Sequence, residues 1–232
     1  QTNLHLTCLE KLEITEAVQE KIIDVRIRLS RLYTSLSHNE NAMKAIEPII
    51  EIVKNQKYED KYASINFILG NYLYTIEEKI EEAIGYLEKA IIYGKKHSDF
   101  ISFWLASYNL GILYAYNLNF DASEKYFMKC IELSGIAENI TGIVIAKTTF
   151  GIFGPLLTGL DKARTLSQEC FQYIDDKTGP YIKASLYTYD GVIQYFKGEV
   201  ETAIGKLEEG MRYSFETQSL MWVAWSCAIL AN

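Results

Sequence analysis

The chain has 232 residues, of which 49% are hydrophobic and 23% charged, so it carries too much apolar side chain to remain disordered. Its formal net charge of −7 argues against a broad nucleic-acid-binding face, because phosphate contacts need clustered Lys and Arg. No apolar run reaches the roughly 18 residues that a membrane span requires. Gly (14 residues) and Pro (3 residues) are sparse, which favours long helices over many short strands.

The cysteines argue against a disulfide framework or a zinc site. Cys8, Cys130, Cys170 and Cys227 lie far apart, and none belongs to a CxxC pair. Scattered thiols are typical of a reducing compartment, so we expect a cytoplasmic protein. The chain begins with Gln1 rather than Met and shows no signal peptide, so we expect it to be a fragment of a longer protein.

A repeat of about 40 residues runs through the whole chain. Bulky residues surround one small residue in the stretches LSRLYTS, ILGNYLY, NLGILYA, TFGIFGP and YDGVIQY. A period kept over this length predicts one structural unit used several times. The small residues, spaced by 40 or 41 positions, are Ser30, Gly70, Gly111, Gly151 and Gly191, with Ala231 as a sixth candidate.

Further small residues follow each of these at regular distances. About 12 positions later come Ala42, Ala83, Ser123, Ala163 and Ala203. Seven positions beyond these come Ala90, Cys130, Cys170 and Gly210, whereas the first repeat has Ile49 there. Seven residues are two helical turns, so the two small residues share one helix face. Each unit is therefore predicted to be a helix A, a short turn and a helix B in close contact.

In chain order the predicted repeats are about 15–57, 58–98, 99–137, 138–178 and 179–217, with a partial sixth at 218–232 and a short helix before Thr15. Pro48 lies inside the first helix B and predicts a bend, because proline removes a backbone donor. Gly198 is predicted to end a helix A in the left-handed conformation. The run GIFGPLLTG at 151–159 predicts either an early helix end at Gly154-Pro155 or a hinge between two halves of the array.

The segment NLGILYAYNLNFDASEKYFMKCIEL resembles a tetratricopeptide repeat, with a small residue, an aromatic three positions later, a turn, and two small residues seven apart. The resemblance extends from Thr15 to about Thr217. It implies an all-α fold, an α-solenoid of tetratricopeptide-like helix pairs forming a right-handed superhelix.

The 40-residue form of the repeat resembles arrays in large bacterial AAA/STAND-type ATPases. The stretches EKIIDVRIRLSRLY and GPYIKASLYTYDGVIQYFKGEVETAIGKLEEGMRYS are similar to the repeat region of proteins that join such an ATPase to an adenylate or guanylate cyclase module. The signatures of the ATPase and of the cyclase are themselves missing from these 232 residues.

No residue pattern predicts catalysis. The sequence lacks a GxxxxGK[ST] phosphate loop, and His5, His38 and His97 have no partner at metal-ligand spacing. Acidic residues follow helical surface patterns rather than forming an isolated acid–base pair. We therefore expect no catalytic residue, no metal, no cofactor and no enzyme activity in this chain.

Helical arrays bind partners along their inner surface. Spacing from the small residue of each helix A predicts a mostly aromatic and apolar inner stripe, although aromatics at helical spacing also suit a core. Domains that clamp a partner's terminal carboxylates carry several Lys, Arg and Asn here, whereas this chain has only two such residues. The candidate groove residues are Arg31, Phe67, Asn71, Tyr74, Tyr108, Ile112, Tyr116, Thr148, Ile152, Thr188, Tyr195 and Phe196.

These features predict a non-catalytic interaction and regulatory module of a multidomain signalling protein. Its partners would be protein segments or other domains of the same chain, and not nucleic acid or membrane. A free-standing adaptor or receptor that holds a peptide in the inner groove is the alternative. Self-association through the C-terminal helix is also expected, because apolar residues from Leu220 to Leu230 cover more than one face.

Overall fold

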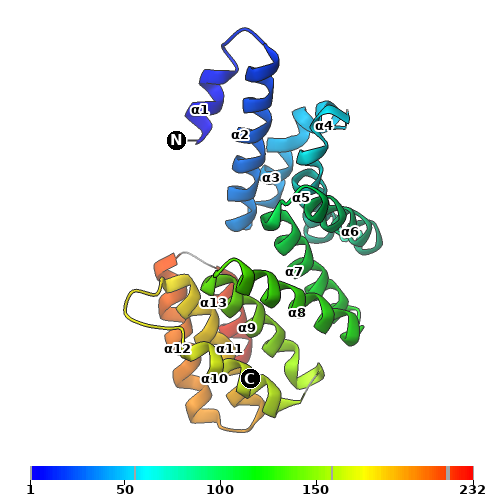
Figure 1. The fold of residues 1–232 in the computed structure, drawn as a ribbon. Helices are drawn as coiled ribbons and strands as arrows, with labels where there is room; N and C mark the ends of the chain where they lie inside the picture. The colour runs from blue at the N-terminus through cyan, green and yellow to red at the C-terminus, as the bar shows by residue number, and fades with distance from the viewer. Residues whose placement is uncertain (1, 55, 158, 218–219, 232) are drawn as a thin grey trace. The chain divides into compact units, whose positions relative to one another are not determined.

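The computed structural model describes residues 2–54, 56–157, 159–217 and 220–231, and every regular element among them is a helix (Figure 1). The all-α fold class is therefore confirmed. The chain forms two compact units, residues 1–113 and 114–232. The segment 151–159 lies inside the second unit, so the boundary between the units does not fall at the hinge that the sequence suggested.

The first unit holds the first two repeats and most of the third helix A. Its helices are α1 (Thr2–Leu9), α2 (Glu16–Ser35), α3 (Asn39–Ile46), α4 (Ile50–Val53), α5 (Tyr62–Thr75), α6 (Ile80–Lys96) and α7 (Phe100–Tyr116), which ends in the second unit. Helix α1 confirms the short helix expected before Thr15. Helices α2 and α3 pack together, as do α5 and α6, and α5 also contacts α2 and α3.

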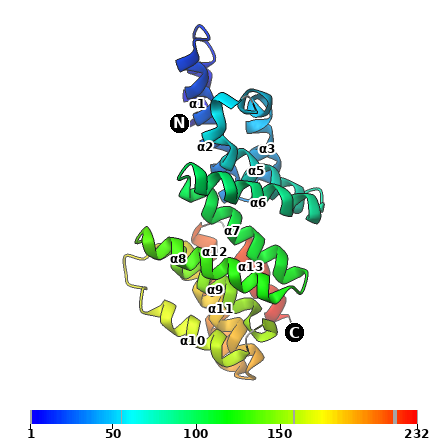
Figure 2. The same cartoon turned by 45° about the vertical axis from the view of Figure 1, so that its right-hand side comes forward.

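The second unit continues the alternation of helices A and B. Its helices are α8 (Phe120–Ile136), α9 (Ile140–Leu157), α10 (Leu160–Phe171), α11 (Pro180–Phe196), α12 (Val200–Thr217) and α13 (Leu220–Leu230). Helix α11 contacts α9, α10, α12 and α13, so it occupies the centre of this unit (Figure 2). The expectation that a helix ends at Gly154-Pro155 is wrong, because α9 continues to Leu157. Pro155 therefore lies within the last turn of α9 and does not end the helix.

The periodic small residues lie where each helix A meets its own helix B. The Ser30 hydroxyl donates to the carbonyl oxygen of Ala42 at 2.7 Å. A Cβ added to Gly70 would lie 2.8 Å from Cγ of Leu87, and one added to Gly191 would lie 2.6 Å from Cγ of Leu207. Larger residues at these positions would push the paired helices apart, so the predicted close contact is confirmed.

The turns between helix A and helix B share one backbone design. Ser37, Leu118 and Gly198 follow the first, third and fifth helices A, and their φ angles are 61°, 56° and 80°. The amide of the next residue bonds back to a carbonyl five positions earlier, as in His38 to Tyr33 at 2.9 Å. This arrangement satisfies the last carbonyls of the helix. The left-handed conformation predicted at Gly198 is confirmed, and three other repeats adopt it without glycine, at Ser37, Glu78 and Leu118.

Pro48 marks a break in the first helix B, as its position predicts. Helix α3 ends at Ile46, a 3₁₀ turn covers Glu47–Ile49, and α4 follows as a single short helix. The helix B of the second repeat, α6, runs unbroken for 17 residues. The first repeat is therefore the irregular one, because proline cannot complete the helical hydrogen-bond ladder.

Candidate functional site

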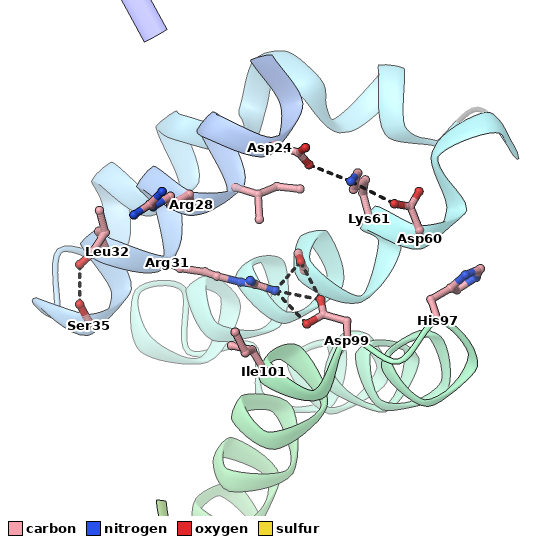
Figure 3. A pocket seen from close by; sticks show the side chains of 12 residues that line it. Asp24, Arg28, Arg31, Leu32, Ser35, Asp60, Lys61, His97, Asp99 and Ile101 are labelled. Atoms are coloured by element: carbon pink, nitrogen blue, oxygen red, sulfur yellow. Dashed lines mark hydrogen bonds and ion pairs between the residues drawn. The ribbon is translucent and has the colours of Figure 1, made fainter. Parts of the chain in front are cut away.

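A pocket of about 680 Å³ opens on the helix A side of the first unit (Figure 3). Side chains from α2, from the 3₁₀ turn Gln56–Lys61 before α5, from α5 itself, and from His97 to Ile101 line it. Three consecutive repeats therefore contribute to one concavity. We call it the helix A pocket.

Arg31 forms the polar wall of the helix A pocket. Its Nη2 atom lies within hydrogen-bond distance of Oγ of Ser64 at 2.7 Å, Oδ2 of Asp99 at 2.8 Å and Oγ of Ser102 at 2.7 Å, which share its two hydrogens. The hydroxyl of Ser64 also donates to Oδ2 of Asp99 at 3.0 Å. The two charged side chains are only 25% and 19% exposed, so this ion pair is largely shielded from water. Shielding strengthens it relative to a surface pair.

Asp99 holds this position because it caps α7. Its Oδ1 accepts from the backbone amide of Ser102 at 3.1 Å, and its own carbonyl accepts from the amide of Phe103. Burial opposes ionisation of Asp99, but the charge of Arg31 and the hydrogen bonds from Ser102 and Ser64 outweigh it, so the pKa of Asp99 lies below its ordinary value. The carboxylate is therefore charged at neutral pH.

A second charged group sits beside the first. The Lys61 ammonium lies 2.8 Å from Oδ1 of Asp24 and 3.0 Å from Oδ2 of Asp60. Burial lowers the pKa of Lys61, but the hydrogen bonds and charges of the two carboxylates outweigh it, and the pKa is raised overall. Lys61 stays protonated and pairs with both carboxylates, so it is structural within the pocket.

The open part of the pocket combines one free cation with apolar side chains. Arg28 is exposed and makes no hydrogen bond or ion pair with any residue that the structure describes. Leu32 and Ile101 line the same pocket and are 46% and 59% exposed. A ligand there would meet a guanidinium beside uncovered aliphatic surface.

Five of the twelve predicted groove residues belong to the interior instead. Their exposed fractions are 7% or less, because neighbouring helices cover them, and they are Phe67, Asn71, Thr148, Ile152 and Thr188. The amide of Asn71 donates to Oδ1 of Asn39 at 2.8 Å and its Oδ1 accepts from the amide of Asn109 at 3.1 Å. This amide ladder joins three repeats, so Asn71 serves packing.

The other predicted residues reach the surface to different extents. Tyr116 and Phe196 are 61% and 52% exposed, whereas the half-buried ones are Arg31, Tyr74, Tyr108, Ile112 and Tyr195. Only Arg31 of the twelve lines the helix A pocket. Sequence reasoning missed Arg28 and Asp99, although Asp99 begins an Asp-x-x-Ser pattern that is a helix-start signal.

The described residues hold no group of three or more His, Cys, Asp or Glu side chains placed to bind a metal ion. Burial raises the pKa of the Cys170 thiol to about 12, and that of Cys130 is raised as well, so these two thiols are unreactive. Across the helices that the structure describes, none is long and apolar enough to cross a membrane.

The comparisons with known proteins agree on the architecture. Residues 106–135 match the family model described as tetratricopeptide repeat. The chain is similar in structure to BtubC (BKLC) from P. vanneervenii, with a TM-score of 0.66 and 10% identity over 94% of this chain and 90% of that one. No curated protein sequence matches the chain significantly.

The nearly identical TPR-like repeats attributed to a putative kinesin light chain of Podosopora anserina are also similar, with a TM-score of 0.59 and 14% identity over 85% of this chain and 97% of that one. A variant of the same repeats gives a TM-score of 0.61 and 15% identity, over 84% of this chain and 96% of that one. At such identities the likeness concerns the fold alone. The chain thus has the fold of a tetratricopeptide-like helical-repeat array, and residues 106–135 match the tetratricopeptide-repeat family model.

Proposed function

We propose that this chain is a non-catalytic protein-interaction module that binds a polypeptide segment in the helix A pocket. Tetratricopeptide repeats generally mediate contacts between proteins, and their fold is typically non-catalytic. The observation that carries the proposal is Arg28, an exposed cation without a partner among the described residues, next to exposed Leu32 and Ile101. A segment with an apolar side chain beside a carboxylate complements both features.

The polar wall of the pocket supports this role by staying rigid. Nη2 of Arg31 and the side chains of Ser64, Asp99 and Ser102 already bond to one another. A ligand need not reorganise them, so little of its binding energy is lost in ordering the site. The polypeptide would come from a separate protein or from another domain of the same chain.

We place the module, as a finer proposal, in a signalling protein that also carries an ATPase or a nucleotide cyclase. The resemblance of the stretches from Glu20 to Tyr33 and from Gly179 to Ser214 to such repeat regions supports it. A partner that favours one arrangement of the repeats would bias the attached enzyme by a shift in populations. The domain content of the full gene tests this, and a gene without an effector domain favours the free-standing adaptor instead.

Selection of random dodecapeptides displayed on phage tests the binding role directly. We expect peptides that bind the wild-type chain and lose about tenfold or more in affinity with Arg28→Glu, because the substitution reverses a pocket charge that has no partner among the described residues. Lys44→Glu is the matched control, since Lys44 is a 70% exposed cation on α3, away from the pocket. Peptides that bind Arg28→Glu as well as the wild type would place the binding surface elsewhere.

A further inference from the structure

A second groove, of about 510 Å³, lies on the helix B side of the first unit, among α4, α5 and α6. Its distinctive side chains are Tyr62, Tyr86, Tyr93, Lys54 and Lys89, above an aliphatic floor. We call it the tyrosine groove. No residue of the helix A pocket belongs to it.

The irregular first repeat shapes this groove. Its wall on one side is α4, the short helix that follows the break at Pro48, together with Lys54 just after it. The opposite walls are the regular helices α5 and α6. Because Pro48 breaks the first helix B, one wall of the groove is the short helix α4, whereas the other walls are the long helices α5 and α6. The feature belongs to the first repeat and not to the repeat pattern.

The aromatic side chains are arranged as an open surface. The rings of Tyr62 and Tyr93 meet edge to face with centroids 4.9 Å apart, and the Tyr62 hydroxyl donates to the carbonyl of Lys54. Tyr62, Tyr86 and Tyr93 are only half-buried. Within the described part of the chain, the hydroxyls of Tyr86 and Tyr93 have no hydrogen-bond partner. Such side chains offer apolar contact area and a polar group together, which is the composition of binding hot spots.

The charge of the lining is opposite to that of the chain. The chain carries a net charge of −7, yet the groove is lined by two lysines and by no Asp or Glu among the described residues. The Lys89 ammonium lies 5.2 Å from the centroid of the Tyr86 ring and has no carboxylate partner in the described part of the chain. Lys54 pairs with Glu51, which is 82% exposed and lies outside the groove. The ammonium of Lys89 is therefore free to face an anionic partner, and that of Lys54 can do so by exchanging its exposed partner Glu51.

We infer that the tyrosine groove is a second docking site, which takes an acidic protein segment carrying a large apolar side chain. The apolar side chain packs among the three tyrosines, and carboxylates on either side of it pair with Lys54 and Lys89. The overall negative charge of the chain repels acidic ligands at long range, so affinity for such a segment requires a local site of opposite sign.

The inference is tested with three matched peptides: acetyl-SEEFEES-amide, and two versions in which Gln or Lys replaces every Glu. Each peptide is titrated against the whole chain, and binding is followed by NMR of the backbone amides. We expect the acidic peptide to bind about tenfold more tightly than the Gln peptide, and the Lys peptide not to bind. The largest shifts should fall on α4, α5 and α6. Equal binding of the acidic and Gln peptides would overturn the proposal.

Variants then locate the site. Lys89→Glu should weaken the acidic peptide about tenfold and Tyr93→Ala should weaken it as well, whereas Lys44→Glu should change it less than about twofold. If Tyr93→Ala unfolds the chain, Tyr93→Leu removes the hydroxyl and ring edge while keeping the bulk. Loss on Arg28→Glu but not on Lys89→Glu would assign the peptide to the helix A pocket and overturn the inference. Displacement by inorganic phosphate alone would do so too, because it would show an anion site without apolar recognition.

Discussion

Nη2 of Arg31 lies 2.8 Å from Oδ2 of Asp99, although 68 residues separate the two in the chain. They belong to the first and third repeats, and the hydroxyl of Ser64 in the second bonds to both. A single ion pair thus links three successive helices A of the first unit. Because both side chains are mostly buried, breaking the pair leaves a poorly solvated charge.

Asp99→Asn should destabilise the first unit by about 1–2 kcal/mol, since it removes the charge and keeps a side chain that can cap α7. Asp99→Ala loses the cap as well and should cost about 1 kcal/mol more. Urea unfolding followed by circular dichroism measures both. If the two variants lose the same free energy of unfolding, the cap contributes nothing to stability. If Asp99→Asn is as stable as the wild type, the charge of Asp99 contributes nothing.

The same carboxylate predicts a pH dependence. The pKa of Asp99 is lower in the folded state than in the unfolded chain, so its contribution is present above the unfolded value of about 4. It is lost as the pH falls through the folded value. The difference in unfolding free energy between wild type and Asp99→Asn should be constant from neutral pH to about pH 5 and shrink in more acidic solution. A difference that does not change with pH would contradict the assignment.

The turns after helix A predict opposite effects at two equivalent positions. Leu118 is 72% exposed with φ of 56°, and Leu118→Gly should raise stability by about 0.5–1 kcal/mol, because only glycine adopts this conformation freely. Gly198 has φ of 80°, and Gly198→Ala should lower stability by about 1 kcal/mol. Thermal melting compares them. Destabilisation by Leu118→Gly would show that the Leu118 side chain makes a contact worth more than the strain.

Tyr108 and Tyr116 should respond differently to truncation. Tyr116 is 61% exposed, and its ring meets that of Phe153 edge to face with centroids 5.7 Å apart. Tyr116→Ala should therefore lower the free energy of unfolding by less than about 1 kcal/mol. Tyr108 is half-buried, and its ring stacks on that of Trp104 with centroids 5.2 Å apart. Tyr108→Ala should therefore lower the free energy of unfolding by about 2 kcal/mol. Urea unfolding gives both values. If Tyr116→Ala loses peptide binding but keeps its stability, Tyr116 is a binding contact. If binding is unchanged, Tyr116 is not part of the inner groove that the sequence predicted.

Self-association through α13 stays a prediction, and the structure shows which residues of this helix are exposed for it. Trp222 is 1% exposed because it packs against Tyr189 at 5.1 Å, so the exposed face is made mostly of small residues. These are Ala224, Cys227, Ala228 and Ala231. Small side chains allow a second helix to approach closely.

Ala228→Glu should therefore abolish any concentration-dependent rise in mass seen by light scattering. Ile92→Glu, at a 63% exposed position on α6, is the control and should leave association unchanged. A wild-type chain that stays monomeric at high concentration would show that this face binds no second copy.

The repeat and its internal contacts follow directly from the order of residues along the chain. Gly70 and Gly191 meet Leu87 and Leu207 because a helix, a short turn and a second helix bring residues at fixed spacing together. The break at Pro48 also follows from local chemistry, since proline lacks the donor that a helix needs there. These features depend on neighbours within one repeat, which a periodic pattern encodes.

The exposure of individual side chains on the inner face, in contrast, depends on how the repeats pack against one another. Thr188 and Tyr116 occupy related places in the predicted stripe, yet Thr188 is buried and Tyr116 is exposed. The pairing of Arg31 with Asp99 likewise has no counterpart in sequence spacing. Burial of an inner-face residue depends on how closely the next helix A approaches and at what angle. That angle is set by the packing of side chains from several repeats at once, and a one-dimensional period carries no information about it.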